Sequence, residues 1–155
     1  MLQDDALPCD GFAEAVHAAI LDRPGSILCL FAPGFGYVTR PMQAARARGE
    51  RWMAWRTRAF VPLVAVVYPA AHPARIVEFS EKRKVHMGRA DDAIVATYCR
   101  ALHVPVWATV PCLVEHRDEL PSVMKMRHGR GQPHRLAAYY RQDGGTWRAP
   151  SAVAV

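Results

Sequence analysis

Two pairs of adjacent aspartates are the residues of this chain best suited to chemistry. Asp4-Asp5 lies near the first residue, and Asp91-Asp92 opens a stretch reading RADDAIVATYCRALHVPVWATVPCLVEH that ends at His116. Adjacent carboxylates repel each other, so such a pair is tolerated mainly where water, a helix N-terminus or a cation compensates its charge. Carboxylate oxygens suit Mg²⁺ or Mn²⁺, and an imidazole from His116 would favour Mn²⁺.

The elements between the second aspartate pair and His116 can bring these groups together. The pattern predicts an amphipathic helix from Asp91 to about His103, followed by a strand over 104–110. A strand that runs back beside its helix ends near the start of that helix, so His116 would return towards the carboxylates. A plainer interpretation stays open, in which the aspartates only complement a helix dipole or lie in a solvated turn, and His116 is a surface histidine.

Apolar runs and periodic patterns predict the remaining elements. Strands are expected over 26–32, 51–57 and 60–68, and helices over 11–22, 40–48 and from about Pro73 onward. Met1–Gln3 is typical of the end of a strand, and Asp10 is the expected cap of the first helix. Since strands alternate with helices, we expect an α/β sandwich on a mostly parallel sheet, with sites beyond the carboxyl ends of its strands.

Size and composition fit a single globular domain. The chain has 155 residues, of which 51% are hydrophobic, and no apolar run approaches the ~18 residues of a membrane span. We expect a cytoplasmic protein in which residues 1–125 form the main domain and 126–155 form a basic extension packed on it, with a frayed end. The cysteines stand singly, and we expect free, buried thiols in a reducing compartment; they are Cys9, Cys29, Cys99 and Cys112.

The net charge of +6 comes almost wholly from arginine, with 17 arginines and 3 lysines. Arginine makes planar, bidentate contacts with phosphate and carboxylate, so acidic or phosphorylated partners fit this composition. A GC-rich coding sequence would enrich arginine as well. Nucleic acid is not expected as a partner, because the basic C-terminal third contains no known recognition pattern.

Two segments carry a resemblance to a known family. LQDDALPCDGF and RADDAIVATYCRALHVPVWATVPCLVEHRDELPSV resemble the two acidic motifs of small GT-A-like glycosyltransferases of bacteria and phages, and the resemblance covers residues 1 to about 125 in the family's order. It implies a partial GT-A-like (Rossmann-like) sandwich with a mixed, mostly parallel sheet flanked by helices. It also implies a metal-dependent transferase that moves a sugar from a nucleotide-sugar donor to a hydroxyl acceptor.

The resemblance assigns roles to the two aspartate pairs and the histidine. Asp4 and Asp5 fall on the DxD-like element that holds Mn²⁺ or Mg²⁺ and the donor diphosphate. His116 would complete the metal shell, and Asp91 or Asp92 would be the catalytic base of the acceptor pocket. The chemistry is consistent, since a metal stabilises a diphosphate leaving group while a carboxylate takes the proton of the attacking hydroxyl.

Two further expectations concern the donor side of the site. A basic loop around Arg127, His128 and Arg130 could help clamp the diphosphate. In GT-A folds several strands and helices precede the DxD-like element and bind the nucleotide, whereas this chain begins at that element. We therefore expect a truncated gene, a second polypeptide that supplies the missing half, or a remodelled domain. The alternative function is a non-catalytic remnant that acts as a binding or assembly module, with itself or another chain, through an exposed sheet edge.

Overall fold

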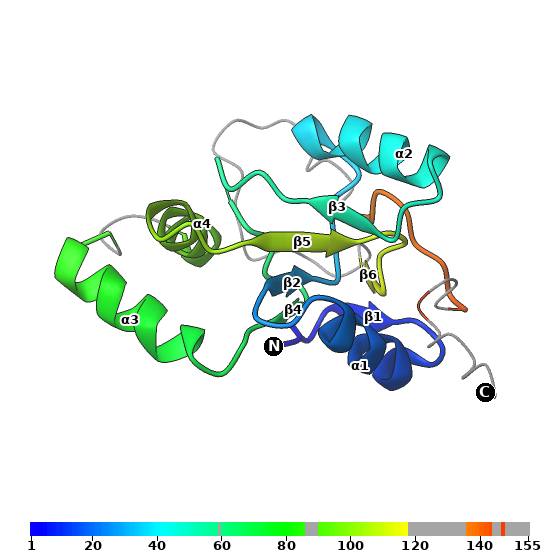
Figure 1. The fold of residues 1–155 in the computed structure, drawn as a ribbon. Helices are drawn as coiled ribbons and strands as arrows, with labels where there is room; N and C mark the ends of the chain where they lie inside the picture. Colours follow the sequence, from blue (N-terminus) through cyan, green and yellow to red (C-terminus); the bar gives the residue numbers. More distant parts are fainter. Residues whose placement is uncertain (59, 86–89, 118–135, 144–146, 148–155) are drawn as a thin grey trace.

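The structure is a computed structural model that describes residues 1–58, 60–85, 90–117, 136–143 and 147. A four-stranded sheet forms its centre, in the order β3 (Trp52–Ala54), β5 (Val106–Thr109), β2 (Ile27–Cys29) and β4 (Val66–Val67) (Figure 1). Only β2 and β5 are parallel, and both outer strands run antiparallel to their neighbours. The α/β class is confirmed, but the expectation of a mostly parallel sheet is wrong.

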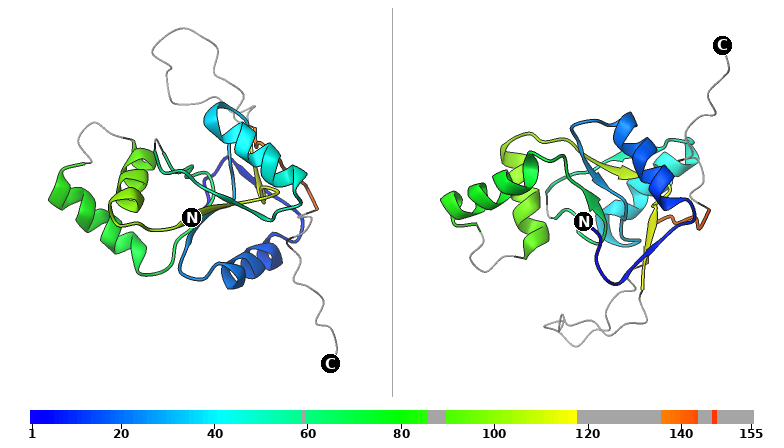
Figure 2. Two further views of the ribbon diagram at one scale, coloured as in Figure 1. Left: turned by 45° about the horizontal axis from the view of Figure 1, so that its top comes forward. Right: turned by 90° about the horizontal axis from the view of Figure 1, so that it is seen from below.

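Helices cover both faces of this sheet. Figure 2 shows α1 (Phe12–Asp22) on one side and α2 (Thr39–Ala47) on the other. Side chains alternate along β2, so that Leu28 packs in one core cluster with α1, while Cys29 packs in the other cluster with α2 and α4 (Asp91–Ala101). Helix α3 (His72–Arg83) packs on α4, and a 3-10 turn, η1 (Gly36–Val38), leads into α2.

Two segments differ from expectation: Met1–Gln3 and the strand expected over 60–68. Met1–Gln3 does not end a strand of its own but bridges to Ala65, and the Val66 N–H donates to the Met1 carbonyl at 2.9 Å. Of the strand expected over 60–68, only β4 forms. Pro62 has no N–H to give to a ladder, so this part of the chain is free to line a pocket instead.

Helix starts follow the sequence with one exception. Pro73 lies in the first turn of α3, and α4 begins at Asp91, as expected. Asp10 does not cap α1, because Gly11 occupies the N-cap position with φ +65°, in the left-handed region that glycine adopts without strain.

Among the described helices, none is long and apolar enough to cross a membrane.

The described parts of the C-terminal stretch pack onto the same domain. The Cys112 N–H donates to the Tyr139 carbonyl at 2.7 Å, and the Ala138 N–H donates to the Ala32 carbonyl at 2.8 Å. Trp147 is fully buried, with its ring 4.4 Å from that of Trp52. These contacts connect residues 136–143 and Trp147 to the central sheet.

All four cysteines are buried and free, as expected, and this leads to a first prediction. Burial raises the pKa of Cys99 and Cys112 from 9.0 to about 12, so both thiols should resist iodoacetamide near pH ~8 until the chain unfolds. A raised native pKa stabilises the fold fully below the unfolded pKa, and this stability is lost as pH rises towards the native pKa. Denaturant midpoints should therefore fall as pH rises above 9.0. Rapid alkylation of the folded protein would contradict this.

Candidate active site

A pocket of about 510 Å³ lies between the residues that follow β2, the segment that precedes β4, the first turn of α4 and the end of β6. Because β2 and β5 are parallel, the residues that follow them gather at one end of the sheet. Helix α4 precedes β5 in the chain, and its first turn contributes Asp91 and Asp92 to the pocket wall. The pocket is lined by Gln3, Phe31, Pro33, Phe35, Phe60, Pro62, Leu63, Val64, Ala90, Asp91, Asp92 and His116.

The small two-stranded sheet brings Asp5 to His116. Strand β1 (Ala6–Pro8) pairs antiparallel with β6 (Val114–His116), with Ala6 opposite His116. Asp5 directly precedes β1, and its carbonyl accepts the Arg117 N–H at 2.8 Å. The first motif and the histidine, more than a hundred residues apart in the chain, are therefore neighbours because of this one strand pairing.

The Asp5–His116 contact is short and buried. Asp5 Oδ2 lies 2.9 Å from His116 Nε2, and only 1% of the His116 side chain is exposed. The two atoms are not aligned as a hydrogen bond, and both His116 nitrogens and Asp5 Oδ1 are buried without a hydrogen-bond partner among the described residues. Leaving a buried polar group unsatisfied costs about 1–3 kcal/mol. Because its side chain is almost fully buried, the interpretation of His116 as a surface histidine is wrong.

A divalent cation fits this pair of side chains. Neighbouring ligands of an octahedral ion with bonds of ~2.1 Å lie about 3 Å apart, close to the 2.9 Å between Asp5 and His116. Within the described ranges no group of three or more His, Cys, Asp or Glu side chains could hold a metal. An ion here would take its remaining ligands from water or from substrate phosphates, which is how Mg²⁺ is commonly bound.

The structure treats the two aspartates of the first motif differently. Neither aspartate lines the pocket itself. Asp5 is half-buried against His116, which does line it, whereas Asp4 is exposed and forms no ion pair with His116. The sequence offered no means of separating the two. Both lie in the turn before β1, and the pairing of Ala6 with His116 places Asp5, which directly precedes Ala6, next to that histidine.

The second aspartate pair opens α4 on another wall of the pocket. The Ala93 N–H donates to Asp92 Oδ1 at 2.7 Å, and the Val61 N–H donates to the Asp92 carbonyl at 3.1 Å. Asp91 is exposed. The positive end of the α4 dipole favours two carboxylates here, so helix capping and a role in the pocket are compatible.

Glu115 is a residue of this region that the motif comparison did not single out. Its Oε1 accepts the N–H of His116 at 2.8 Å and the N–H of Ala137 at 2.6 Å. One carboxylate thus connects the strand that presents His116 to the 136–140 segment. Glu115 lies between Val114 and His116 in the chain, and nothing in the sequence indicated its backbone partners.

This geometry gives a second prediction. Glu115→Ala should lower the free energy of unfolding by about 1–3 kcal/mol, because two backbone N–H groups lose their acceptor. Glu115→Gln should cost less, since its amide oxygen can still accept. Urea denaturation of both variants measures the difference. Equal losses in the two variants would contradict this account of the side chain.

The remaining groups lie outside this pocket or outside the described residues. His72 was not expected as a ligand, and its Nδ1 lies 2.8 Å from the Tyr98 hydroxyl. Arg127, His128 and Arg130 lie outside the described residues. Trp52, Trp55 and Trp107 line a second pocket beside α2.

Comparison of the chain with protein-family models, with curated proteins and with solved structures found no match. The fold and the site therefore define only a class of protein: an α/β domain on a mixed sheet, with a pocket lined by the carboxylates of Asp91 and Asp92 and by the buried His116.

Proposed function

We propose that this protein is a metal-dependent glycosyltransferase-like protein that transfers a sugar from a nucleotide-sugar donor to a hydroxyl acceptor. One observation carries the proposal. Asp91 and Asp92 share a pocket with His116, and His116 contacts Asp5, so groups from both acidic motifs converge on one place. The sequence resemblance supplies the reaction, and this convergence is what supports it.

In this proposal Asp5 and His116 hold the cation, Mn²⁺ or Mg²⁺, on the donor side. When bound, the cation offsets the negative charge that develops on the diphosphate leaving group. Asp5 and His116 would hold it, and the burial of the His116 side chain keeps competing water away from that ligand. Asp4 is exposed, and in this proposal it contacts the nucleotide part of the donor or solvent.

Asp91 or Asp92 takes the proton from the acceptor hydroxyl. Both line the pocket, as a general base within reach of the acceptor must. Apolar side chains, Phe31, Phe35 and Phe60 among them, form much of the remaining wall. They suit the apolar face of a sugar or similar ring, while the carboxylates orient its hydroxyls.

The test is calorimetry of the wild-type protein with Mn²⁺ and with UDP or GDP. Because the protein supplies two ligands, Mn²⁺ should bind much more tightly with the nucleotide present than alone, and the nucleotide should bind only with the metal. No binding of either nucleotide at millimolar concentration in the presence of Mn²⁺ would overturn the active-enzyme proposal.

A further inference from the structure

Strand β3 forms an edge of the central sheet, and its outer side is unpaired. The Val110 N–H donates to the Arg51 carbonyl and the Trp55 N–H donates to the Val106 carbonyl, each at 2.9 Å. Bonded positions alternate along an antiparallel strand, so the N–H and C=O groups of Trp52 and Ala54 point away from β5. Neither residue makes a backbone hydrogen bond on that side within the described parts of the chain.

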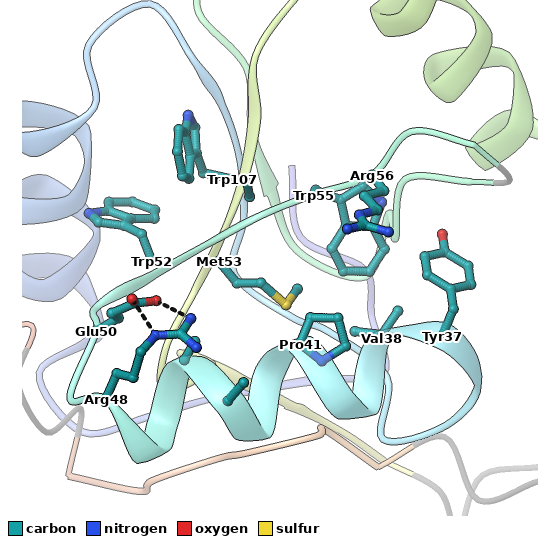
Figure 3. Close-up of a pocket in the computed structure, with 13 residues that line it drawn as sticks. Tyr37, Val38, Pro41, Arg48, Glu50, Trp52, Met53, Trp55, Arg56 and Trp107 are labelled. Carbon is teal, nitrogen blue, oxygen red and sulfur yellow. Dashed lines mark hydrogen bonds and ion pairs between the residues drawn. The ribbon is translucent and has the colours of Figure 1, made fainter.

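A groove runs along this edge beside α2. It has a volume of about 390 Å³. In Figure 3, Met53 and Trp55 lie between β3 and α2, where Pro41 faces them, while Trp52 and Trp107 lie on the other side of β3. An unpaired strand next to a helix, with apolar side chains along both of its faces, is the arrangement that accepts an additional strand.

The charge around the groove indicates what kind of segment fits. Residues 39–58 contain six arginines and one carboxylate, that of Glu50. Arg48 is paired with Glu50 at 2.6 Å, and Arg51 with Asp22 of α1 at 2.9 Å. Arg56 is exposed in the groove wall without an ion pair to any described residue. A second copy of this chain would bring the same basic surface against itself, which disfavours pairing of β3 with β3.

We propose that an extended, acidic peptide segment of a partner protein binds here by adding a strand to β3. Its backbone pairs with the free N–H and C=O groups of Trp52 and Ala54. Its side chains alternate, so that one set lies on the α2 side of β3, next to Met53, and the other lies on the side of Trp52. An acidic residue of the segment faces Arg56. This site is separate from the proposed active site and does not depend on it.

The experiment uses two short fluorescent peptides with blocked ends. Both alternate valine and threonine, and one ends in aspartates while the other ends in lysines. Fluorescence polarisation of the full chain should show binding of the aspartate peptide that weakens with salt, and at least about tenfold weaker binding of the lysine peptide. Ala54→Pro removes an outward N–H at an edge position that tolerates proline, and should abolish binding. Ala54→Val retains that N–H and is the matched control.

Two measurements keep the result interpretable if Ala54→Pro folds poorly. Arg56→Glu should weaken the aspartate peptide and strengthen the lysine peptide. Hydrogen exchange of the wild-type protein should show protection of the Trp52 and Ala54 amides when the aspartate peptide binds. Unchanged binding in a folded Ala54→Pro protein, equal binding of both peptides, or no binding at all would overturn the proposal. Dimerisation in sedimentation that Ala54→Pro abolishes would overturn it too, since it would make a second copy the occupant.

Discussion

Replacing His116 by alanine is expected to abolish metal-assisted nucleotide binding. His116 is one of two protein ligands in the proposed site, and its nitrogens have no other described partner. Loss of supporting groups around a metal already costs about 10–100-fold in affinity, so loss of a ligand should cost at least ~100-fold. Calorimetry of Mn²⁺ with UDP or GDP measures this, and Asp5→Asn, a near-isosteric change, should give a similar loss.

His17→Ala is the matched control, because His17 is exposed on α1, away from the pocket. It should bind Mn²⁺ and nucleotide like the wild type. Circular dichroism must show that His116→Ala and Asp5→Asn are folded. If both fold and both still bind Mn²⁺ together with nucleotide at wild-type affinity, the metal is held elsewhere and the assignment of the site is wrong.

Replacing the catalytic aspartate by asparagine should remove turnover and leave binding intact. A positioned general base contributes about 10²–10⁴-fold, so either Asp91→Asn or Asp92→Asn should lower the rate of UDP release from a UDP-sugar by that factor. Affinity for Mn²⁺ and nucleotide should stay unchanged, because neither carboxylate contacts Asp5 or His116 in the structure. Comparing the two variants also shows which of the two aspartates, both of which line the pocket, is the general base.

Asp143→Asn provides the control for loss of a surface carboxylate, since Asp143 pairs with Arg141 at an exposed position. Helix α4 begins with the aspartates, so a change there also removes a favourable dipole interaction of about 0.3–1 kcal/mol. That loss lowers stability without altering the rate of the folded protein. Full turnover in both asparagine variants would exclude a carboxylate base on α4.

The elements with strong local signals were predictable. Asp91 at the start of α4, Pro73 in the first turn of α3 and the apolar residues of β2 and β5 were read correctly, because helix starts and buried strands depend on residues a few positions apart. The direction of the strands was not predictable. An α/β alternation favours parallel neighbours, but β3 and β4 both run antiparallel, and no local pattern encodes that choice.

The sequence by itself determined which side chains are chemically capable: two aspartate pairs and a histidine at the end of a helix–strand unit. Only the tertiary structure separated Asp5 from Asp4, buried His116, and joined the histidine to Glu115 and the 136–140 segment. The reason is physical. These contacts depend on the β1–β6 register and on β2 lying beside β5, and both are long-range pairings whose energy comes from burial of a shared core rather than from local propensity.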